Sequence, residues 1–249
     1  MEMSKRPKSK KVLVFLSAFC VLVLVLATAF FVYTGVYYPA DTLAWEKAEE
    51  YGVRVEQKEG YIAILPIEGT PKAGYVFYPG GKVEAEAYLP YLAEVAAQGY
   101  YCCLLQVPFK LAVFDMDAAA KPIQEAPAIE VWAVGGHSLG GVAAASFASK
   151  NQAVKGLVLL ASYSSADISA SSLQVLSITA TKDEVLNWQK YEEANVKLPA
   201  VTEYVSIAGG NHGQFGMYGH QKGDGNATIT PEEQQWQVAE VTVLFLGKL

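Results

Sequence analysis

The segment Gly136-His137-Ser138-Leu139-Gly140 places a serine between glycines, after an apolar run and before a run of small residues. A G-x-S-x-G pattern in this setting predicts a sharp strand-to-helix turn that raises the serine hydroxyl above the edge of a sheet. Gly136 and Gly140 lack the Cβ atoms that would collide where the strand and the helix nearly touch. The alternative is a glycine-rich structural turn, but the flanking strand and helix favour Ser138 as a nucleophile.

A nucleophilic serine needs a histidine base, which follows it in the chain when it lies on a turn of this kind. Two histidines follow Ser138. His212 lies in a glycine-rich loop directly after the predicted strand 202–207, where the backbone is free to place an imidazole over the sheet edge. His220 has no strand immediately before it. We therefore predict His212 as the base and keep His220 as the alternative.

The carboxylate that orients the base should follow the strand between the serine and the histidine. Residues 173–180 form that predicted strand, and Asp183 lies in the turn that leaves it. Glu184 would serve if the turn were one residue longer, and Asp167 follows the preceding strand. Asp183 could also cap the next helix, a structural role compatible with a catalytic one. Asp183 is the predicted acid.

An anion site for the reacting oxygen should combine two backbone N–H groups. Leu139, at the start of the helix after the serine, supplies one. The second should come from the loop that follows the predicted strand 73–78, where a glycine pair lets the backbone approach a ligand closely. We predict the N–H groups of Gly81 and Leu139, with Gly80 or Lys82 as alternatives to Gly81.

Four places in chain order carry a resemblance to a known family: the Pro79-Gly80-Gly81 loop, the segment 136–141, Asp183 and His212. The chain resembles the α/β-hydrolases over about residues 50–249. It is similar to the small dienelactone-hydrolase-like branch, which has little or no cap domain. That branch uses a cysteine nucleophile, so its own activity does not carry over to a serine. The resemblance implies a mostly parallel central sheet with helices on both faces, and hydrolysis of carboxylic esters or related acyl compounds without a cofactor or metal.

These observations predict a serine hydrolase of the esterase type that acts on a small acyl or ester substrate. An acyltransferase that uses the same serine is one alternative. A non-catalytic binding protein with the hydrolase fold is another, because a fold does not fix a function. The substrate and the oligomeric state are not readable from the sequence.

The N-terminal residues predict a membrane anchor. Residues 1–11 are basic, and residues 12–33 contain no charge over a length that could cross a hydrocarbon core of about 30 Å as a helix. The basic segment should remain in the cytoplasm, which places the catalytic domain outside it. The alternative is a cleaved signal peptide with Ala27-Thr28-Ala29 at its cleavage site and a secreted enzyme. Residues 34–49 are a predicted linker, and residues 50–249 are the predicted catalytic domain.

Charge and cysteine content narrow the function further. Five of the 19 basic residues precede Val12, so the remaining chain is more acidic than the net charge of −6 indicates. A domain of this charge has no electrostatic basis for binding nucleic acid. Cys102 and Cys103 are neighbours in an apolar strand and should point to opposite faces as buried packing residues rather than form a bridge.

Strands and helices should alternate as a parallel sheet with crossover helices requires. An antiparallel pair at 53–56 and 61–65 should lead. Further strands are predicted near 73–78, 100–106, 130–135, 155–161, 173–180 and 202–207, and helices near 84–98, 139–150, 184–194 and 231–246. Any small lid should come from the irregular segment 107–129, and the aromatic residues within 214–219 could equally line an acyl pocket or pack in the core.

Overall fold

The structure, a computed structural model, describes residues 10–249. The chain divides into two compact units, one that ends at Val36 and one that runs from Tyr37 to Leu249. The first unit consists of helix α1, and the second holds all the predicted site residues.

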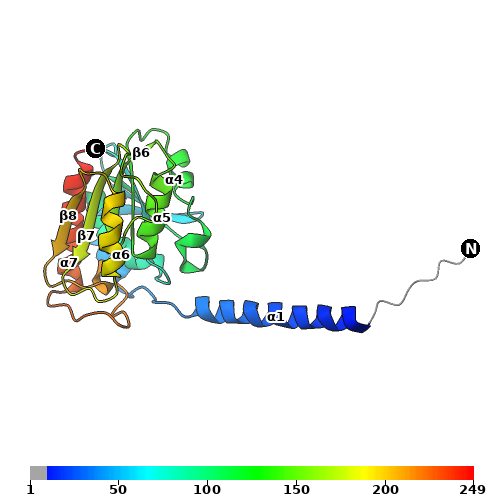
Figure 1. The fold of residues 1–249 in the computed structure, drawn as a ribbon. Helices are drawn as coiled ribbons and strands as arrows, with labels where there is room; N and C mark the ends of the chain where they lie inside the picture. Colours follow the sequence, from blue (N-terminus) through cyan, green and yellow to red (C-terminus); the bar gives the residue numbers. More distant parts are fainter. Residues whose placement is uncertain (1–9) are drawn as a thin grey trace, which may run out of the picture. The chain divides into compact units, whose positions relative to one another are not determined.

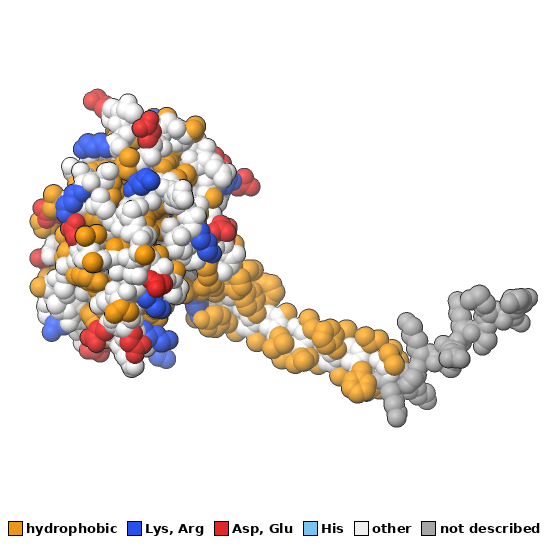
Figure 2. All heavy atoms as spheres, turned by 45° about the horizontal axis from the view of Figure 1, so that its top comes forward, with side chains coloured by type: hydrophobic (Ala, Val, Ile, Leu, Met, Phe, Trp, Pro, Cys, Tyr) orange, Lys and Arg blue, Asp and Glu red, His pale blue; other side chains and the backbone are white. Residues whose placement is uncertain are grey.

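Helix α1 covers Lys10–Gly35. Its segment Val12–Gly35 has a mean hydropathy of 2.9 and is not buried in the structure. Hydrophobic side chains cover the visible side of the helix along its length (Figure 2). Among residues 10–249 this is the one helix long and apolar enough to cross a membrane, a property that a signal sequence near the N-terminus shares. The predicted basic segment falls mostly on residues 1–9, which lie outside the described residues.

The second unit contains one eight-stranded sheet with the strand order β1-β2-β4-β3-β5-β6-β7-β8. Strands β1 and β2 form an antiparallel pair, and β2 also pairs antiparallel with β4, whereas all later pairs are parallel. The strands are β1 Val53–Lys58, β2 Tyr61–Pro66, β3 Gly74–Tyr78, β4 Tyr101–Leu105, β5 Trp132–His137, β6 Val154–Leu160, β7 Gln174–Ala180 and β8 Glu203–Ile207. The predicted mostly parallel sheet with a leading antiparallel pair is confirmed.

Helices cover both faces of this sheet (Figure 1). One face packs against α2, α3 and α7, and the other against α4 and α5. The helices are α2 Ala44–Glu49, α3 Leu89–Ala97, α4 Ala120–Glu125, α5 Leu139–Ala148, α6 Trp188–Ala194 and α7 Pro231–Leu246, with short 3-10 turns at Ala85–Tyr88, Pro108–Lys110, Ala112–Phe114, Asn195–Lys197 and Gly213–Phe215. Cys102 belongs to the core on the first face and Cys103 to the core on the second, as the alternation predicts.

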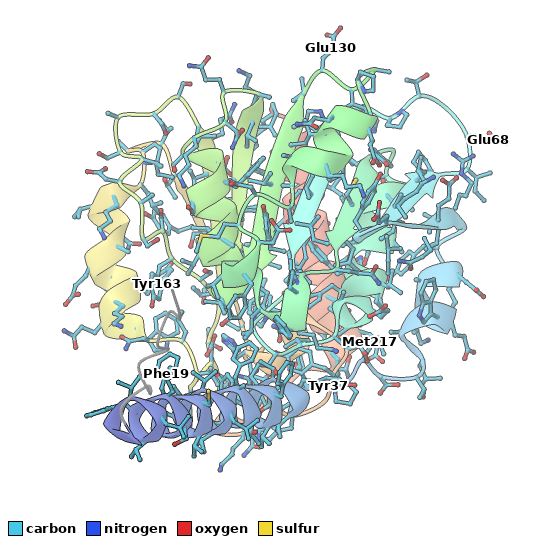
Figure 3. The ribbon with its side chains drawn as sticks, turned by 90° about the vertical axis from the view of Figure 1, so that its right-hand side faces the viewer. Phe19, Tyr37, Glu68, Glu130, Tyr163 and Met217 are labelled. Atoms are coloured by element: carbon cyan, nitrogen blue, oxygen red, sulfur yellow. The ribbon has the colours of Figure 1, made fainter. Side chains whose placement is uncertain are left out.

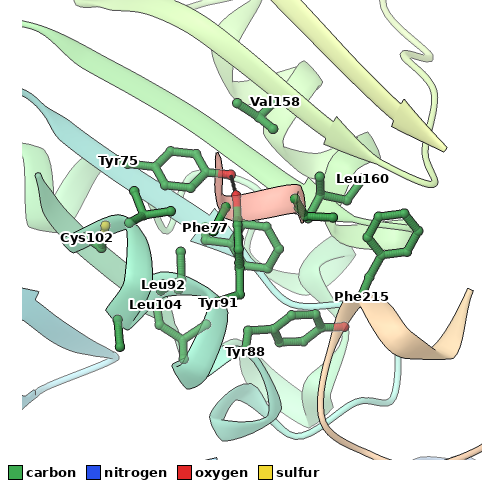
Figure 4. Packing of buried hydrophobic residues seen from close by; sticks show 14 of the residues in the cluster. Tyr75, Phe77, Tyr88, Tyr91, Leu92, Cys102, Leu104, Val158, Leu160 and Phe215 are labelled. Atoms are coloured by element: carbon green, nitrogen blue, oxygen red, sulfur yellow. Dashed lines mark hydrogen bonds between the residues drawn. The ribbon is translucent and has the colours of Figure 1, made fainter. Parts of the chain in front are cut away.

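Tyrosines that bury their hydroxyl groups are prominent in the core on the α3 side (Figure 4). The Tyr75 hydroxyl lies 3.1 Å from the Tyr91 hydroxyl, which in turn lies 3.0 Å from Oγ1 of Thr242 in α7. Burial of a hydroxyl costs free energy unless it finds a hydrogen-bond partner. This chain of hydroxyls therefore fixes α3 against both the sheet and α7.

Three elements differ from the prediction, the first being helix α4, which forms within the segment 107–129 that was expected to be irregular. Within the predicted linker, Ala44–Glu49 forms α2, which buries Ala44 and Ala48. Helix α6 begins at Trp188 instead of residue 184, because the preceding residues form a loop and Asn187 caps the helix by accepting the N–H of Lys190 at 2.9 Å. Thr230 caps α7, since its Oγ1 accepts the N–H of Glu233 at 3.1 Å.

Candidate active site

Ser138 occupies a strained turn between β5 and α5. Its φ of 51° and ψ of −119° lie outside the regions that L-residues prefer. A methyl group at Gly136 would overlap the backbone of Gly140, and one at Gly140 would overlap the backbone oxygens of Tyr78 and Pro79. The two glycines therefore permit a packing between strand and helix that no larger residue allows.

The predicted nucleophile, acid and base each follow the carboxyl end of a parallel strand. Ser138 follows β5, Asp183 follows β7 and His212 follows β8. Parallel strands bring their carboxyl ends to one edge of a sheet, where ligand sites of open α/β sheets lie. Residues separated by up to 74 positions in sequence thus meet there.

The structure places His212 and Asp183 in direct contact. Nδ1 of His212 lies 2.8 Å from Oδ2 of Asp183, and both side chains are almost wholly buried. A carboxylate can only accept, so Nδ1 of His212 donates, and in the neutral imidazole Nε2 carries the lone pair. That Nε2 atom is buried and makes no hydrogen bond to any described residue.

The second carboxylate oxygen of Asp183 closes the turn that follows β7. Oδ1 accepts the N–H groups of Val185 and Leu186 at 2.9 and 2.8 Å. One oxygen therefore binds the histidine while the other holds the local backbone. These bonds also explain why α6 starts late, since they fold residues 183–187 into a loop.

Ser138 and His212 line the same pocket of about 210 Å³. The remaining wall residues come from α5, from the segment after β6 and from the loop before α6: Leu139, Val142, Ala161, Ser162, Tyr163, Val185, Leu186 and Asn187. Ser138 is partly exposed, so a solute can reach it. No residue of the predicted lid segment 107–129 lines this pocket.

The aromatic residues within 214–219 pack in the core and do not line the Ser138 pocket. Phe215, Met217 and Tyr218 are buried, and none of them lines the Ser138 pocket. Phe215 instead packs against the ring of His137, with centroids 5.4 Å apart.

The alternatives to the predicted histidine and acid lie elsewhere. His220 is exposed and lines a separate pocket of about 340 Å³. The Asp167 carboxylate is exposed and accepts from the backbone and the hydroxyl of Ser169. Glu184 is exposed, and its backbone N–H rather than its side chain joins the network around the site.

The loop after β3 brings Gly81 against the start of α5. A Cβ added at Gly81 would lie 2.9 Å from Cδ2 of Leu139, so the loop and the start of α5 are closely packed here. The N–H of Gly80 donates to the Tyr88 hydroxyl at 3.1 Å, and the N–H of Lys82 donates to the carbonyl of Lys110 at 2.7 Å. The N–H of Gly81 donates to no other described residue, which leaves it available to a ligand.

His137, which precedes Ser138 in the turn between β5 and α5, belongs to a buried network that the sequence did not predict. Its Nδ1 lies 2.8 Å from the hydroxyl of Tyr88, and its ring packs 4.4 Å from the ring of His212. Burial, and then the neighbouring His212, hold the pKa of His137 well below its usual value. An uncharged imidazole therefore packs against the ring of the predicted base.

Asp224 is a second residue that sequence patterns missed. Its Oδ2 accepts the N–H of Gly213 at 2.8 Å, and its Oδ1 accepts the N–H groups of Glu184 at 3.3 Å and Gly225 at 2.9 Å. Gly213 follows His212 and Glu184 follows Asp183, so one carboxylate ties the histidine loop to the acid loop. Only the tertiary structure reveals this tie, because Asp224 lies in an irregular segment.

Gln234 of α7 fixes the histidine loop from the other side. Its Oε1 accepts the N–H of Asn211 at 2.9 Å, and its Nε2 donates to the carbonyl of Asn211 at 2.8 Å. Both bonds are buried. The residue before His212 is thereby held in one orientation.

Comparison with known proteins agrees with this fold. Residues 74–237 match the family model described as "Alpha/beta hydrolase family". Comparison with curated proteins finds no match.

Solved structures with the same fold are numerous. TT1662 from Thermus thermophilus is 15% identical with a TM-score of 0.58, and the match covers 79% of this chain and 97% of that one. A predicted CIB-like hydrolase from Thermoplasma acidophilum is 13% identical with a TM-score of 0.56, covering 80% and 100%. The esterase domain of a Rhodothermus marinus protein is 12% identical with a TM-score of 0.59, covering 78% and 97%. Since the family model spans more than half of its length, the chain belongs to the alpha/beta hydrolase family.

Proposed function

We propose that the protein is a membrane-anchored serine hydrolase that cleaves a carboxylic ester or related acyl compound outside the cytoplasm. The observation that carries this proposal is the hydrogen bond of 2.8 Å between His212 and Asp183 beside a pocket that Ser138 also lines. The family and the hydrolase-like neighbours support a hydrolase. The serine mechanism, the location and the substrate class are the proposal.

In the first half-reaction, Nε2 of His212 takes the hydroxyl proton of Ser138 as Oγ attacks the acyl carbon. The tetrahedral oxyanion accepts hydrogen bonds from the N–H groups of Gly81 and Leu139. His212 then gives the proton to the leaving oxygen while the bond between carbon and that oxygen breaks. The products are an acyl-enzyme ester on Ser138 and a free alcohol. Asp183 keeps the imidazole oriented and stabilises its protonated form.

In the second half-reaction, water replaces the alcohol. His212 takes a proton from water as the water oxygen attacks the acyl carbon, and the same two N–H groups hold the new oxyanion. When this intermediate collapses, the proton returns to Ser138 and the carboxylic acid leaves. No step needs an ion or a cofactor beyond the residues named.

The proposed anchor rests on α1, whose uncharged length suits a bilayer. The basic residues before it favour a cytoplasmic N-terminus, and this orientation puts the domain from Tyr37 onward on the other side. A cleaved signal and a secreted enzyme remain the alternative outcome for this segment.

A fluorophosphonate probe tests the proposed nucleophile, because an activated serine attacks phosphorus as it attacks an acyl carbon. We expect the full-length protein to be labelled and Ser138→Ala to be unlabelled. Ser162→Ala is the matched control, since Ser162 lines the same pocket but uses its hydroxyl to hold the carbonyl of Ser138. Labelling that persists in Ser138→Ala would assign the reaction to another residue. A panel of p-nitrophenyl esters of increasing chain length then measures the acyl preference.

A further inference from the structure

An exposed apolar surface adjoins the loop that carries Gly81. We name it the aromatic face, and it consists of Tyr37, Phe109, Lys110, Val113 and Phe114. Its aromatic rings and valine are exposed by 39% at Tyr37, 45% at Phe109, 42% at Val113 and 52% at Phe114. The rings of Phe109 and Phe114 pack edge to face with centroids 5.6 Å apart, and Nζ of Lys110 lies 3.8 Å from the ring centre of Tyr37. Two segments distant in sequence therefore form one surface.

The backbone under the aromatic face is strained. Phe109 and Lys110 have φ angles of 55° and 56°, in the left-handed region that non-glycine residues seldom occupy. Such strain persists only where the surroundings hold it, and it gathers at functional surfaces. Here the Lys110 carbonyl accepts the N–H of Lys82 at 2.7 Å, and the Lys110 N–H donates to Val107 at 3.2 Å. The fold thus maintains a costly conformation that leaves a phenylalanine ring exposed.

Tyr37 belongs to the aromatic face and is the second residue after the end of α1. Helix α1 ends at Gly35, and two extended residues reach at most about 7 Å. With α1 across a bilayer, as the proposed function has it, Tyr37 must lie in the interfacial layer. Tyrosine and lysine are both favoured in that layer, where a lysine stem lies along apolar surface and its charge stays in water. The contact between Tyr37 and Lys110 then brings the rest of the aromatic face to the same depth.

The aromatic face also lies beside the proposed anion site. Leu111, next to Lys110, has its Cδ2 3.7 Å from the position of a Cβ at Gly81. Tyr163, a wall residue of the Ser138 pocket, lies at the same end of the domain as Tyr37, whereas Glu68 and Glu130 lie at the opposite end (Figure 3). A bilayer in contact with the aromatic face would therefore adjoin the end of the domain that holds Tyr163 of the pocket wall.

We propose that the aromatic face rests on the bilayer surface and that the enzyme takes amphipathic acyl compounds carried in that bilayer. This inference rests on the proposed anchor and on Ser138 as the nucleophile. Exposed aromatic rings insert at the boundary between head groups and acyl chains, which orients a domain that a single helix would only tether.

Depth-dependent fluorescence quenching tests the contact in the full-length chain. In the protein used for this experiment, the exposed Cys20 is replaced by serine (Cys20→Ser). Because Cys102 and Cys103 are buried, a single added cysteine can then be labelled with the fluorophore NBD. Three variants, Val113→Cys, Ile67→Cys and Leu24→Cys, are reconstituted separately into phosphatidylcholine vesicles. Ile67 is the matched control, because it is 66% exposed and adjoins Glu68 at the far end of the domain.

We expect a lipid with a shallow nitroxide to quench the label at position 113, and one with a deep nitroxide to quench the label at position 24. The label at position 67 should respond only to an aqueous quencher. If position 24 is quenched by lipid but position 113 behaves like position 67, the anchor stands and the aromatic face proposal is wrong. If lipid quenches neither position 24 nor position 113, both are wrong.

Kinetics in vesicles test the substrate class. The double variant Phe109→Asn/Phe114→Asn introduces asparagine, which tolerates the positive φ at position 109. We expect it to hydrolyse a long-chain p-nitrophenyl ester carried in vesicles about tenfold more slowly than the parent, since it loses apolar insertion. Hydrolysis of soluble p-nitrophenyl acetate should be unchanged, and Ile67→Asn should affect neither substrate. The substrate class is overturned if the variant loses activity equally on both substrates, or if it loses activity on neither. Absence of acetate hydrolysis in the parent protein would instead refute the serine hydrolase itself.

Discussion

His137 is the residue whose chemistry depends most on its burial. Its Nδ1 meets the hydroxyl of Tyr88, while its ring lies among His212, Phe215 and Tyr218. Those neighbours offer no negative charge, so the protonated form has nothing to offset its desolvation. A positive charge here would also repel the proton that His212 must receive in the proposed mechanism. The network thus favours a site in which only His212 changes charge.

This burial predicts how stability depends on pH. The folded pKa of His137 lies well below its usual value, whereas the unfolded chain binds a proton at about pH 6.5. Below that pH the unfolded state binds more protons, so the free energy of unfolding falls by up to about 1.4 kcal/mol per pH unit. We expect Tm to drop as the pH falls through about 6.5, where the unfolded histidine takes up its proton, and to drop less in His137→Gln. The exposed His220→Gln should keep the parent slope, and an unchanged slope in His137→Gln would contradict the argument.

The proposed base and acid predict a ranking of activities. His212→Ala should lower kcat by several orders of magnitude, and Asp183→Asn should lower it by about 10⁴-fold, the loss seen when a triad aspartate becomes an amide. His220→Ala and Asp167→Asn are matched controls and should retain most activity, because both side chains are exposed and neither lines the Ser138 pocket. The p-nitrophenyl ester assay measures all four variants. Greater loss in His220→Ala than in His212→Ala would move the base to His220.

At the scale of elements, the site depends on loops that are tied to one another. Helix α7 holds Asn211 through Gln234, and the segment that contains Asp224 holds the loops after β7 and β8. Each tie uses a buried polar group with two or more partners. Such fully satisfied networks fix a geometry more rigidly than apolar packing alone.

Asp224→Asn should therefore impair the site while the fold survives. An asparagine has one acceptor oxygen in place of two, so it would turn an N–H₂ group toward the N–H of either Gly213 or Glu184. Leaving one buried donor unpaired costs about 1–3 kcal/mol. We expect a lower Tm and a reduced kcat with KM nearly unchanged, because the wall of the Ser138 pocket does not include Asp224. A normal kcat together with a lower Tm would show that Asp224 only stabilises the fold.

The strands and the turn at Ser138 could be predicted because their signals are local. Apolar runs mark the buried strands, and the glycines around Ser138 mark a turn that tolerates no Cβ. The position of β3 between β4 and β5 has no such signal, because strand order depends on crossovers that pack over the whole sheet. Helix α2 does have a local signal, which the prediction did not use. This signal is Asp41, whose side chain accepts the N–H of Leu43 just before the helix begins.

The candidate site was predictable in part for a similar reason. Chain order pointed to Asp183 and His212, and the structure brings the two together, although their catalytic roles remain a prediction. The preference for Gly81 over its neighbours needed tertiary partners, namely Tyr88 for Gly80 and Lys110 for Lys82. Asp224 lies in no motif, because its function comes from two loops that meet only in the folded chain.

At the scale of the whole molecule, the two units have contrasting surfaces. Helix α1 exposes apolar side chains over its length, whereas the chain beyond it is acidic in balance. An acidic domain gains little from electrostatic attraction to anionic lipid, so attachment through charge is not expected. Attachment through α1 and the aromatic face relies on apolar contact, which salt does not screen.

This contrast predicts how the full-length protein behaves in cells. It should sediment with membranes and resist extraction by high salt or carbonate, because a spanning helix is insensitive to ionic strength, whereas interactions between surface charges are screened within about 10 Å at 0.1 M salt. Protease added outside intact cells or spheroplasts should digest the domain from Tyr37 onward while α1 stays protected. Release by salt would show a peripheral protein. A mature N-terminus near Phe30, found by sequencing the native protein, would show that the segment is a cleaved signal, in which case the aromatic face would have no anchor to bring it to a bilayer.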